Sequence, residues 1–223
     1  MTFKLTASPE FSILLLGLDN AGKTTFLSQL KSLYTPSHPL PASSTIPTVG
    51  QNVALLDFPD MYLKIWDIGG QTSLRGLWNS YYASCHAIIF LIDSTDIGDL
   101  GGDDGEDDAE GGEGRKGSTA KQQHEGRLAE CREVLESVLG HADTSGVPVL
   151  VLANKQDRED SVEVVRIKDG FVRGVFEGRG GGEIRDSRVL PCSALKGTGV
   201  KEAVEWVRKR VVWCKGTRPG VWR

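Results

Sequence analysis

Cysteine and histidine are scarce in this 223-residue sequence, with four of each, and neither occurs at the spacing of a metal site. The cysteines lie far apart without a C-x-x-C pair, and the histidines form no cluster with them. This pattern indicates neither a structural zinc site nor the disulfide framework of a small secreted protein. We interpret Cys85, Cys131, Cys192 and Cys214 as reduced thiols, which favours a cytoplasmic protein.

Long apolar runs are also missing, and none approaches the ~20 residues that a membrane-spanning helix needs. The sequence has no signal peptide, residue 2 is threonine rather than the glycine of an N-myristoylation signal, and its last residues contain no prenylation cysteine. We therefore expect neither a membrane-spanning helix nor one of these lipid anchors.

The sequence also lacks a positive net charge: it has 26 basic and 30 acidic residues, which gives a formal net charge of −4. No nucleic-acid partner is therefore expected. The charge is unevenly spread: residues 96–114 hold nine acidic residues and no basic one, and the rest of the chain has a net charge of about +5. We expect the Gly-, Asp- and Glu-rich segment 96–126 to be a disordered insertion, serving either as a solvated spacer or as an acidic interaction segment.

The apolar pattern predicts a single α/β domain, since strands alternate with helices along the chain. Continuous or alternating apolar residues predict strands at residues 13–16, 53–65 (a hairpin), 87–92, 147–153 and 188–191. Apolar residues at helical spacing predict helices after residue 25 and at 128–139, 162–176 and 200–211, while residues 35–45 and 178–182 are expected to be loops. We therefore predict a mostly parallel six-stranded sheet with helices on both faces and an antiparallel hairpin at one edge.

The most informative stretch is residues 17–25, which read G-L-D-N-A-G-K-T-T between the first predicted strand and the first predicted helix. This is the context of the phosphate-binding loop G-x-x-x-x-G-K-[ST], whose backbone N–H groups and helix N-terminus hold phosphates. Lys23 is expected to reach the β- and γ-phosphates and the Thr24 hydroxyl to bind Mg²⁺. The nucleotide-binding residues predicted in this loop are Gly17, Leu18, Asp19, Asn20, Ala21, Gly22, Lys23, Thr24 and Thr25.

Two further segments supply groups for a γ-phosphate. In I-P-T at 46–48, Thr48 can give its hydroxyl to Mg²⁺ and its N–H to the γ-phosphate. In W-D-I-G-G-Q at 66–71, Asp67 can hold Mg²⁺ through a water, the Gly70 N–H can reach the γ-phosphate and Gln71 can orient the attacking water. Gln71 and Lys23 are thus the predicted catalytic residues, and Thr24 and Thr48 the predicted metal ligands.

The remaining two segments point to guanine. In N-K-Q-D, residues 154–157, Asp157 can accept both N–H groups of the guanine edge, which adenine cannot offer, and the Lys155 stem can lie along the base. In C-S-A at 192–194, the Ala194 N–H can bond guanine O6. Asn154 and Ser193 complete the predicted nucleotide site, and the five segments together indicate a guanine-nucleotide hydrolase with bound GTP or GDP.

These five segments resemble the ADP-ribosylation factor family of small GTPases over roughly residues 11–96 and 125–213. Residues 77–86 and 92–96 are most similar to the ADP-ribosylation-factor-related subgroup of the trans-Golgi. The resemblance implies a P-loop small GTPase domain at 11–213, interrupted by the insertion at about 96–126 and flanked by tails at 1–10 and 214–223. The sequence departs from the family at Gln51, where the family has an apolar residue of its effector patch with Trp66 and Tyr81, and in its short N-terminal segment.

The resemblance also implies what the protein does. It implies a switch that binds GTP and GDP with Mg²⁺, hydrolyses GTP slowly alone, and cycles between cytoplasm and trans-Golgi membranes by peripheral association of its GTP form. The implied partners are a guanine nucleotide exchange factor, a GTPase-activating protein that supplies an arginine finger, Golgi effectors and a Golgi membrane receptor. Two alternatives remain open at this point: a GTP-binding scaffold with negligible hydrolysis, and a P-loop ATPase or small-molecule kinase.

Overall fold

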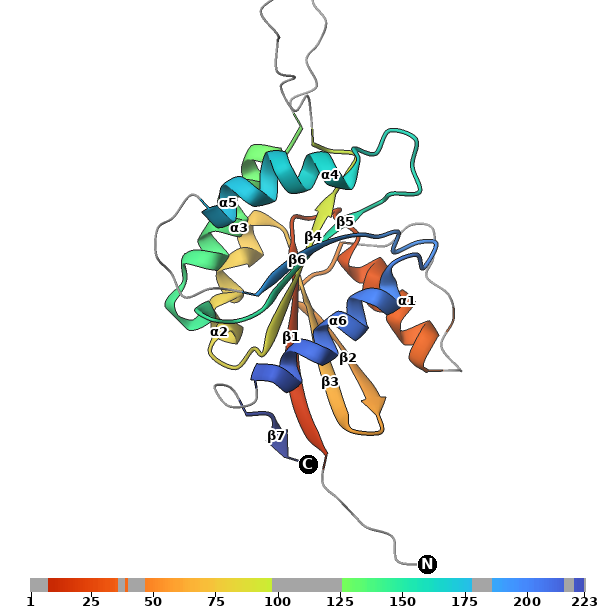
Figure 1. Ribbon diagram of the computed structural model, residues 1–223, viewed down its shortest axis with the longest axis vertical. Helices are drawn as coiled ribbons and strands as arrows, with labels where there is room; N and C mark the ends of the chain where they lie inside the picture. Colours follow the sequence, from red (N-terminus) through yellow and green to blue (C-terminus); the bar gives the residue numbers. More distant parts are fainter. Residues whose placement is uncertain are drawn as a thin grey trace, which may run out of the picture.

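A twisted central sheet organises the computed structural model, which describes residues 8–35, 39, 47–97, 126–177, 186–214 and 219–222 (Figure 1). Its main strands in spatial order are β2 (Gln51–Phe58), β3 (Met61–Ile68), β1 (Pro9–Gly17), β4 (Ala87–Asp93), β5 (Val149–Asn154) and β6 (Ser187–Pro191). β2 and β3 form an antiparallel hairpin, and the other neighbours on this path are parallel. Within the described residues, the predicted six-stranded path with one antiparallel edge hairpin is confirmed.

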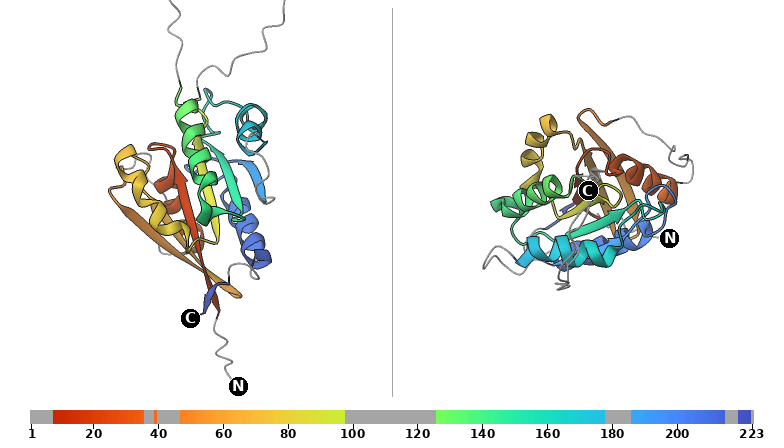
Figure 2. Two further views of the ribbon diagram at one scale, coloured as in Figure 1. Left: turned by 90° about the vertical axis from the view of Figure 1, so that its left-hand side faces the viewer. Right: turned by 90° about the horizontal axis from the view of Figure 1, so that it is seen from above.

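Helices cover both faces of the sheet (Figure 2). One face packs against α1 (Lys23–Tyr34) and α6 (Val200–Trp213), and the other against α2 (Asn79–Tyr82), α3 (Leu128–Gly140), α4 (Val164–Ile167) and α5 (Arg173–Glu177). Further helical turns are η1 (Thr72–Leu77), η2 (Ala142–Thr144) and η3 (Lys168–Val172). No helix in the described ranges is long and apolar enough to cross a bilayer.

Strand β1 anchors both cores. Its alternate residues point to opposite faces, so Ile13 and Leu15 join the α1–α6 core while Leu14 and Leu16 join the α3 core. All four side chains are almost completely buried, and each contributes roughly 1.5–3 kcal/mol of apolar burial. The strand end at Gly17, where the phosphate loop begins, is therefore fixed from both sides.

The structure differs from the sequence prediction in two places. The predicted helix at 162–176 is divided into α4, a π-helical turn η3 and α5, because Gly170 and Gly174 weaken its middle. The predicted tails are shorter than 1–10 and 214–223, since β1 begins at Pro9 and Val221–Trp222 form a strand, β7. Most of the predicted insertion at 96–126, all of the predicted loop at 178–182 and most of the predicted loop at 35–45 lie outside the described residues.

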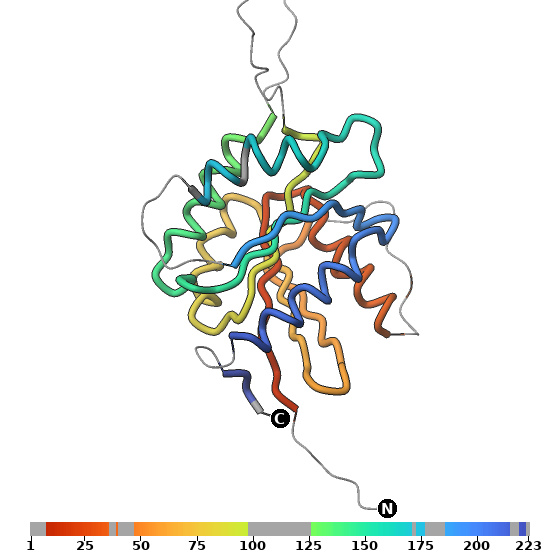
Figure 3. Tube along the Cα trace, in the orientation of Figure 1, coloured from red at the N-terminus to blue at the C-terminus, as the bar shows by residue number. Residues whose placement is uncertain are grey.

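Strand β7 lies antiparallel to the start of β1, with Pro9 opposite Trp222 and Glu10 opposite Val221 (Figure 3). His86, just before β4, links the same region. Its ring Nδ1 accepts a hydrogen bond from the Ser12 backbone N–H (3.0 Å), and its ring Nε2 lies 3.2 Å from the Pro219 carbonyl oxygen. The His86 backbone N–H donates to the Ser12 carbonyl oxygen (2.8 Å). Since Nδ1 is an acceptor, Nε2 carries the proton and donates to Pro219.

Candidate functional site

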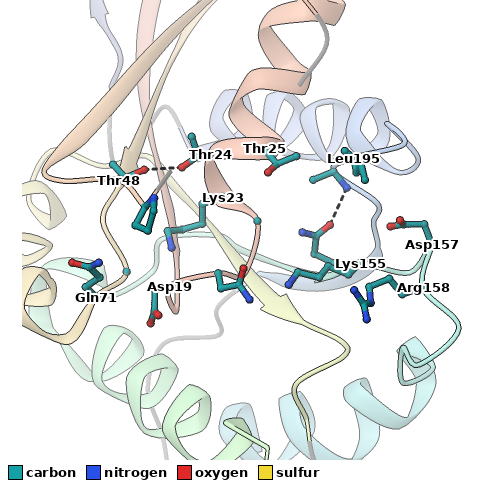
Figure 4. Close-up of a pocket in the computed structure, with 16 residues that line it drawn as sticks. Asp19, Lys23, Thr24, Thr25, Thr48, Gln71, Lys155, Asp157, Arg158 and Leu195 are labelled. Atoms are coloured by element: carbon teal, nitrogen blue, oxygen red, sulfur yellow. Dashed lines mark hydrogen bonds between the residues drawn. The ribbon is translucent and has the colours of Figure 1, made fainter. Parts of the chain in front are cut away.

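A pocket of about 410 Å³ opens at the carboxyl ends of the parallel strands, where ligands bind in open α/β sheets. Figure 4 shows Asp19, Thr48 and Gln71 towards one end and Asp157, Arg158 and Leu195 towards the other. The pocket is lined by Asp19, Asn20, Gly22, Lys23, Thr24, Thr25, Pro47, Thr48, Gly70, Gln71, Asn154, Lys155, Asp157, Arg158, Ala194 and Leu195. All five predicted segments therefore meet at one site.

Some predicted residues lie behind this surface rather than on it: Gly17, Leu18, Ala21, Asp67 and Ser193. Pro47, Arg158 and Leu195 line the pocket without having been predicted. Each of the three is the direct chain neighbour of a predicted residue, so adjacency to a motif was the only signal that the sequence offered for them.

The phosphate loop connects β1 to α1 and requires glycine at both ends. Gly17 and Gly22 have φ angles of 139° and 92°, in the range that side chains disfavour. A Cβ on Gly17 would lie 2.3 Å from the Leu91 carbonyl oxygen, and one on Gly22 would lie 2.3 Å from Asn154 Nδ2. The loop therefore packs directly against the neighbouring strands, with its backbone facing the pocket.

Lys23 begins α1 and is almost completely buried at the base of this loop. Its ammonium group donates to the carbonyl oxygens of Gly17 (3.0 Å) and Leu18 (2.7 Å). Burial lowers the pKa of Lys23 to about 8, an effect that the Asp67 and Asp19 carboxylates oppose. A bound polyphosphate would add negative charge nearby and favour the charged form of this lysine.

Hydroxyl and carboxylate oxygens gather beside the loop in an arrangement that suits Mg²⁺. Thr24 Oγ1 lies 2.7 Å from Thr48 Oγ1 and donates to Asp67 Oδ2 (2.8 Å). Asp67 is fully buried, and its Oδ1 has no hydrogen-bond partner within the described part of the chain. A buried carboxylate oxygen without a partner is costly, whereas oxygen ligands of this kind are those that Mg²⁺ prefers. The residues present thus fit the ion.

Asn52 was missed as a member of this group. Its Nδ2 donates to Asp67 Oδ2 at 3.3 Å, from the β2 strand paired with β3, where Asn52 lies opposite Asp67. Asn52 ends the segment I-P-T-V-G-x-N at residues 46–52. It reaches the Asp67 carboxylate through the pairing register of β2 with β3, which cannot be read from the sequence. Asn52 therefore helps to orient Asp67.

The turn after β3 is held by side chains that follow it in the chain. The Trp78 indole N–H donates to the Gly69 carbonyl (3.0 Å), and Arg75 Nε donates to the Gly70 carbonyl (3.0 Å). Because a trans peptide is planar, fixing the Gly69 carbonyl also fixes the direction of the Gly70 N–H. A Cβ on Gly70 would lie 2.5 Å from both Gly17 O and Lys23 Nζ, so this turn sits directly against the phosphate loop.

At the other end of the pocket, hydrogen bonds join the two predicted base-binding segments. Ser193 Oγ donates to Asp157 Oδ1 (2.6 Å), and Lys155 Nζ pairs with Asp93 Oδ2 (2.5 Å). The Ala194 N–H, predicted to face guanine O6, is donated in this structure to Asn154 Oδ1 (2.9 Å). The reason is that Asn154 is buried and its amide must be satisfied, which it achieves by bridging Ala194 and the Ala21 carbonyl.

Comparison with known proteins gives a consistent result. The sequence matches the ADP-ribosylation factor family over residues 1–102 and 120–211. It is 44% identical over 215 residues to ADP-ribosylation factor-like protein 3 of Saccharomyces cerevisiae, covering 96% of this chain and 92% of that protein. It is 40% identical over 205 residues to ADP-ribosylation factor-related protein 1 of Rattus norvegicus, covering 91% of this chain and 86% of that protein.

A solved structure is similar as well. The Arl6 BBS3 small GTPase of Trypanosoma brucei, with the bound nucleotide analogue GppNp, superimposes with a TM-score of 0.65 at 26% sequence identity. The match covers 92% of this chain and 98% of that one. The fold therefore agrees with that of a nucleotide-binding small GTPase.

Proposed function

The chain belongs to the ADP-ribosylation factor family of GTP-hydrolysing switches, and on this premise we propose that its GTP-bound form acts in vesicle trafficking at trans-Golgi membranes. The observation that carries the site assignment is that five segments, spread from the first strand to the last helix, line one pocket. GTP and GDP are the nucleotides of this family, and Mg²⁺ is its usual metal.

In the proposed site, Lys23 and the N–H groups of the phosphate loop bind the phosphates. Thr24 and Thr48 hold Mg²⁺, with Asp67 behind them, and the ion supplies positive charge that offsets the charge of the phosphoryl group. Gln71, beside Gly70 in the pocket, orients the water for in-line attack on the γ-phosphate.

Guanine selectivity is assigned to Asp157, whose carboxylate can accept both edge N–H groups of the base. Asp157→Asn is expected to weaken GTP binding by at least about 100-fold, because an amide cannot accept both bonds. The matched control is Glu159→Gln, an exposed neighbour that does not line the pocket. If ATP bound wild-type protein as tightly as GTP does, the guanine assignment would be wrong.

An effector surface is proposed on the β2–β3 hairpin and the segment after it. The Trp66 and Tyr81 ring centroids lie 5.4 Å apart, Val53 pairs with Trp66 across the hairpin, and the side chains of Val53 and Leu77 are exposed. Gln51 at the start of β2 is exposed and polar, so it narrows the apolar part of this surface. An exchange factor, an activating protein and a Golgi receptor are the other proposed partners.

The biochemical test is the mass of the small molecule released when the purified protein is denatured, with Mg²⁺ present throughout. About one GDP or GTP per chain is expected. A protein that releases none and also fails to take up labelled GTP would refute the proposed site. Single-turnover hydrolysis with Gln71→Leu as the impaired control then measures the chemical step separately.

The cellular test compares two locked forms. Gln71→Leu should accumulate GTP and concentrate at trans-Golgi membranes, whereas Thr24→Asn, which removes a metal-binding hydroxyl, should be dispersed. If both variants bind nucleotide as designed but distribute identically, the trafficking proposal fails while the nucleotide site stands.

A further inference from the structure

A chain of four charged side chains lies beside the pocket, and Glu130 is at its centre. Glu130 stands in the first turn of α3 and uses both carboxylate oxygens. Oε1 accepts from Arg75 Nη2 (2.5 Å), and Oε2 accepts from Arg127 Nε (2.7 Å). One glutamate on α3 therefore holds two arginines from different segments.

The two arginines reach two neighbouring segments of the candidate site. Arg75 Nε donates to the Gly70 carbonyl oxygen (3.0 Å), and Arg127 Nη2 donates to Asp19 Oδ1 (2.8 Å). Asp19 belongs to the phosphate loop and Gly70 to the turn that carries Gln71. The chain Asp19–Arg127–Glu130–Arg75–Gly70 thus connects these two parts of the site through α3.

The burial and charge of these side chains indicate a partly buried ion-pair network rather than an isolated pair on the solvent-exposed surface. The Arg75 side chain is only 16% exposed, and those of Glu130 and Arg127 are about one-third exposed. Hydrogen bonds from Arg127 and Arg75 hold the pKa of Glu130 below its usual range, and Arg127 does the same for Asp19. Both carboxylates therefore stay charged at neutral pH, and arginine in such paired contacts holds a defined orientation.

The Gly70 contact has a direct geometric consequence. Arg75 fixes the Gly70 carbonyl, and through the planar peptide it fixes the direction of the Gln71 N–H and the backbone from which the Gln71 side chain projects. The Arg75 guanidinium is in turn held by Glu130, whose Oε1 accepts from its Nη2.

We propose that Glu130 is a positioning residue for GTP hydrolysis, which sets the Gly70–Gln71 turn against the phosphate loop through Arg75 and Arg127. The inference rests on the proposed role of Gln71 and extends it to residues outside the family motifs. Glu130 touches neither nucleotide nor water in this proposal. It acts only through the two arginines.

The test measures single-turnover hydrolysis at saturating GTP and, separately, the dissociation constant for GDP. Glu130→Ala is expected to hydrolyse GTP about 10-fold more slowly, since small displacements of a catalytic group cost at least this much. GDP affinity is expected to stay within about 2-fold, because Glu130 does not line the pocket. The isosteric Glu130→Gln should behave similarly and guards against misfolding of the alanine variant. Glu133→Ala, exposed on the same helix, is the matched control and should equal wild type.

A double variant tests the chain itself. Arg75→Ala should slow hydrolysis by about the same factor as Glu130→Ala, and the double variant should be no slower than either single one, because both break the same connection. A double variant that is about 100-fold slower would show independent effects and overturn the proposal.

The other outcomes are also decisive. Wild-type hydrolysis in Glu130→Ala, or a loss of GDP affinity equal to the loss of rate, would overturn the positioning role while leaving the switch function intact. A wild-type protein without Gln71-dependent hydrolysis would remove the proposed catalytic function and this inference with it.

Discussion

Replacing Gly70 by alanine adds a single methyl group at the closest approach between the β3 turn and the phosphate loop. A Cβ there would lie 2.5 Å from Gly17 O and Lys23 Nζ and 2.6 Å from the Asp19 backbone nitrogen. The φ angle of Gly70 is outside the left-handed range, so the substitution introduces contact without backbone strain. The effect of this variant is therefore steric.

The size of the effect follows from the distances. Two of the three contacts are to backbone atoms, which cannot rotate away, and ordinary carbon–oxygen contacts need about 3.4 Å. The turn must move by roughly 1 Å, which displaces the Gly70 N–H and Gln71 together. A misplacement of this size costs about 100-fold in rate, or about 3 kcal/mol of transition-state stabilisation.

Single-turnover hydrolysis of γ-labelled GTP at saturating Mg²⁺ measures this loss. Gly76→Ala is the matched control, because no atom lies within 4 Å of a Cβ at that position, and it should hydrolyse GTP at the wild-type rate. The reasoning would be refuted by a Gly70→Ala variant whose rate is within 3-fold of wild type. GDP binding should be affected less than hydrolysis, since the turn contacts the γ-phosphate side of the pocket.

Three further predictions follow from the structure. Trp78→Phe leaves the buried Gly69 carbonyl without its indole donor, which costs about 2 kcal/mol of folding stability. Calorimetry should therefore show a thermal midpoint lowered by about 4–8 °C. An unchanged midpoint would show that this hydrogen bond does not contribute to stability. Chelation of Mg²⁺ by EDTA should speed release of a fluorescent GDP analogue at least about 10-fold, and equal rates with and without the chelator would exclude the metal from nucleotide retention. Burial raises the pKa of Cys131 and Cys192 to about 12, so iodoacetamide at pH 8 should label the partly exposed Cys214 first, as peptide mass spectrometry would record.

Much of the site was predictable because its residues are local in sequence. Lys23, Thr24 and Asp157 lie in the connections that follow the buried strands β1 and β5, and parallel strands place their carboxyl ends at one edge of the sheet. Apolar runs identified those strands because β4 and β5 are buried on both faces and carry no polar alternation. The motifs and the strand ends were thus sufficient to locate the pocket.

The residues that the sequence did not reveal act through individual hydrogen bonds rather than as parts of a sequence motif. Trp78, Arg75 and Asn52 reach the site through strand register and turn geometry, and their contacts are to backbone carbonyls or to a buried carboxylate. The spacing of these side chains along the sequence does not predict such hydrogen bonds. The bond from the Ala194 N–H to Asn154 Oδ1 was not predicted either, because the two residues lie 40 positions apart in the sequence. A two-residue strand such as β7 is too short for any periodic pattern.

The two ring hydrogen bonds of His86 select one tautomer of the neutral imidazole. Ser12 needs a lone pair on Nδ1 and Pro219 needs a proton on Nε2, and only the neutral ring with one tautomer offers both. A second proton would turn the acceptor into a donor that faces the Ser12 N–H. One side chain that is an acceptor on one nitrogen and a donor on the other therefore links the segment before the C-terminal strand to β1, and a substitution that keeps only one of these two functions would give up one of the two bonds.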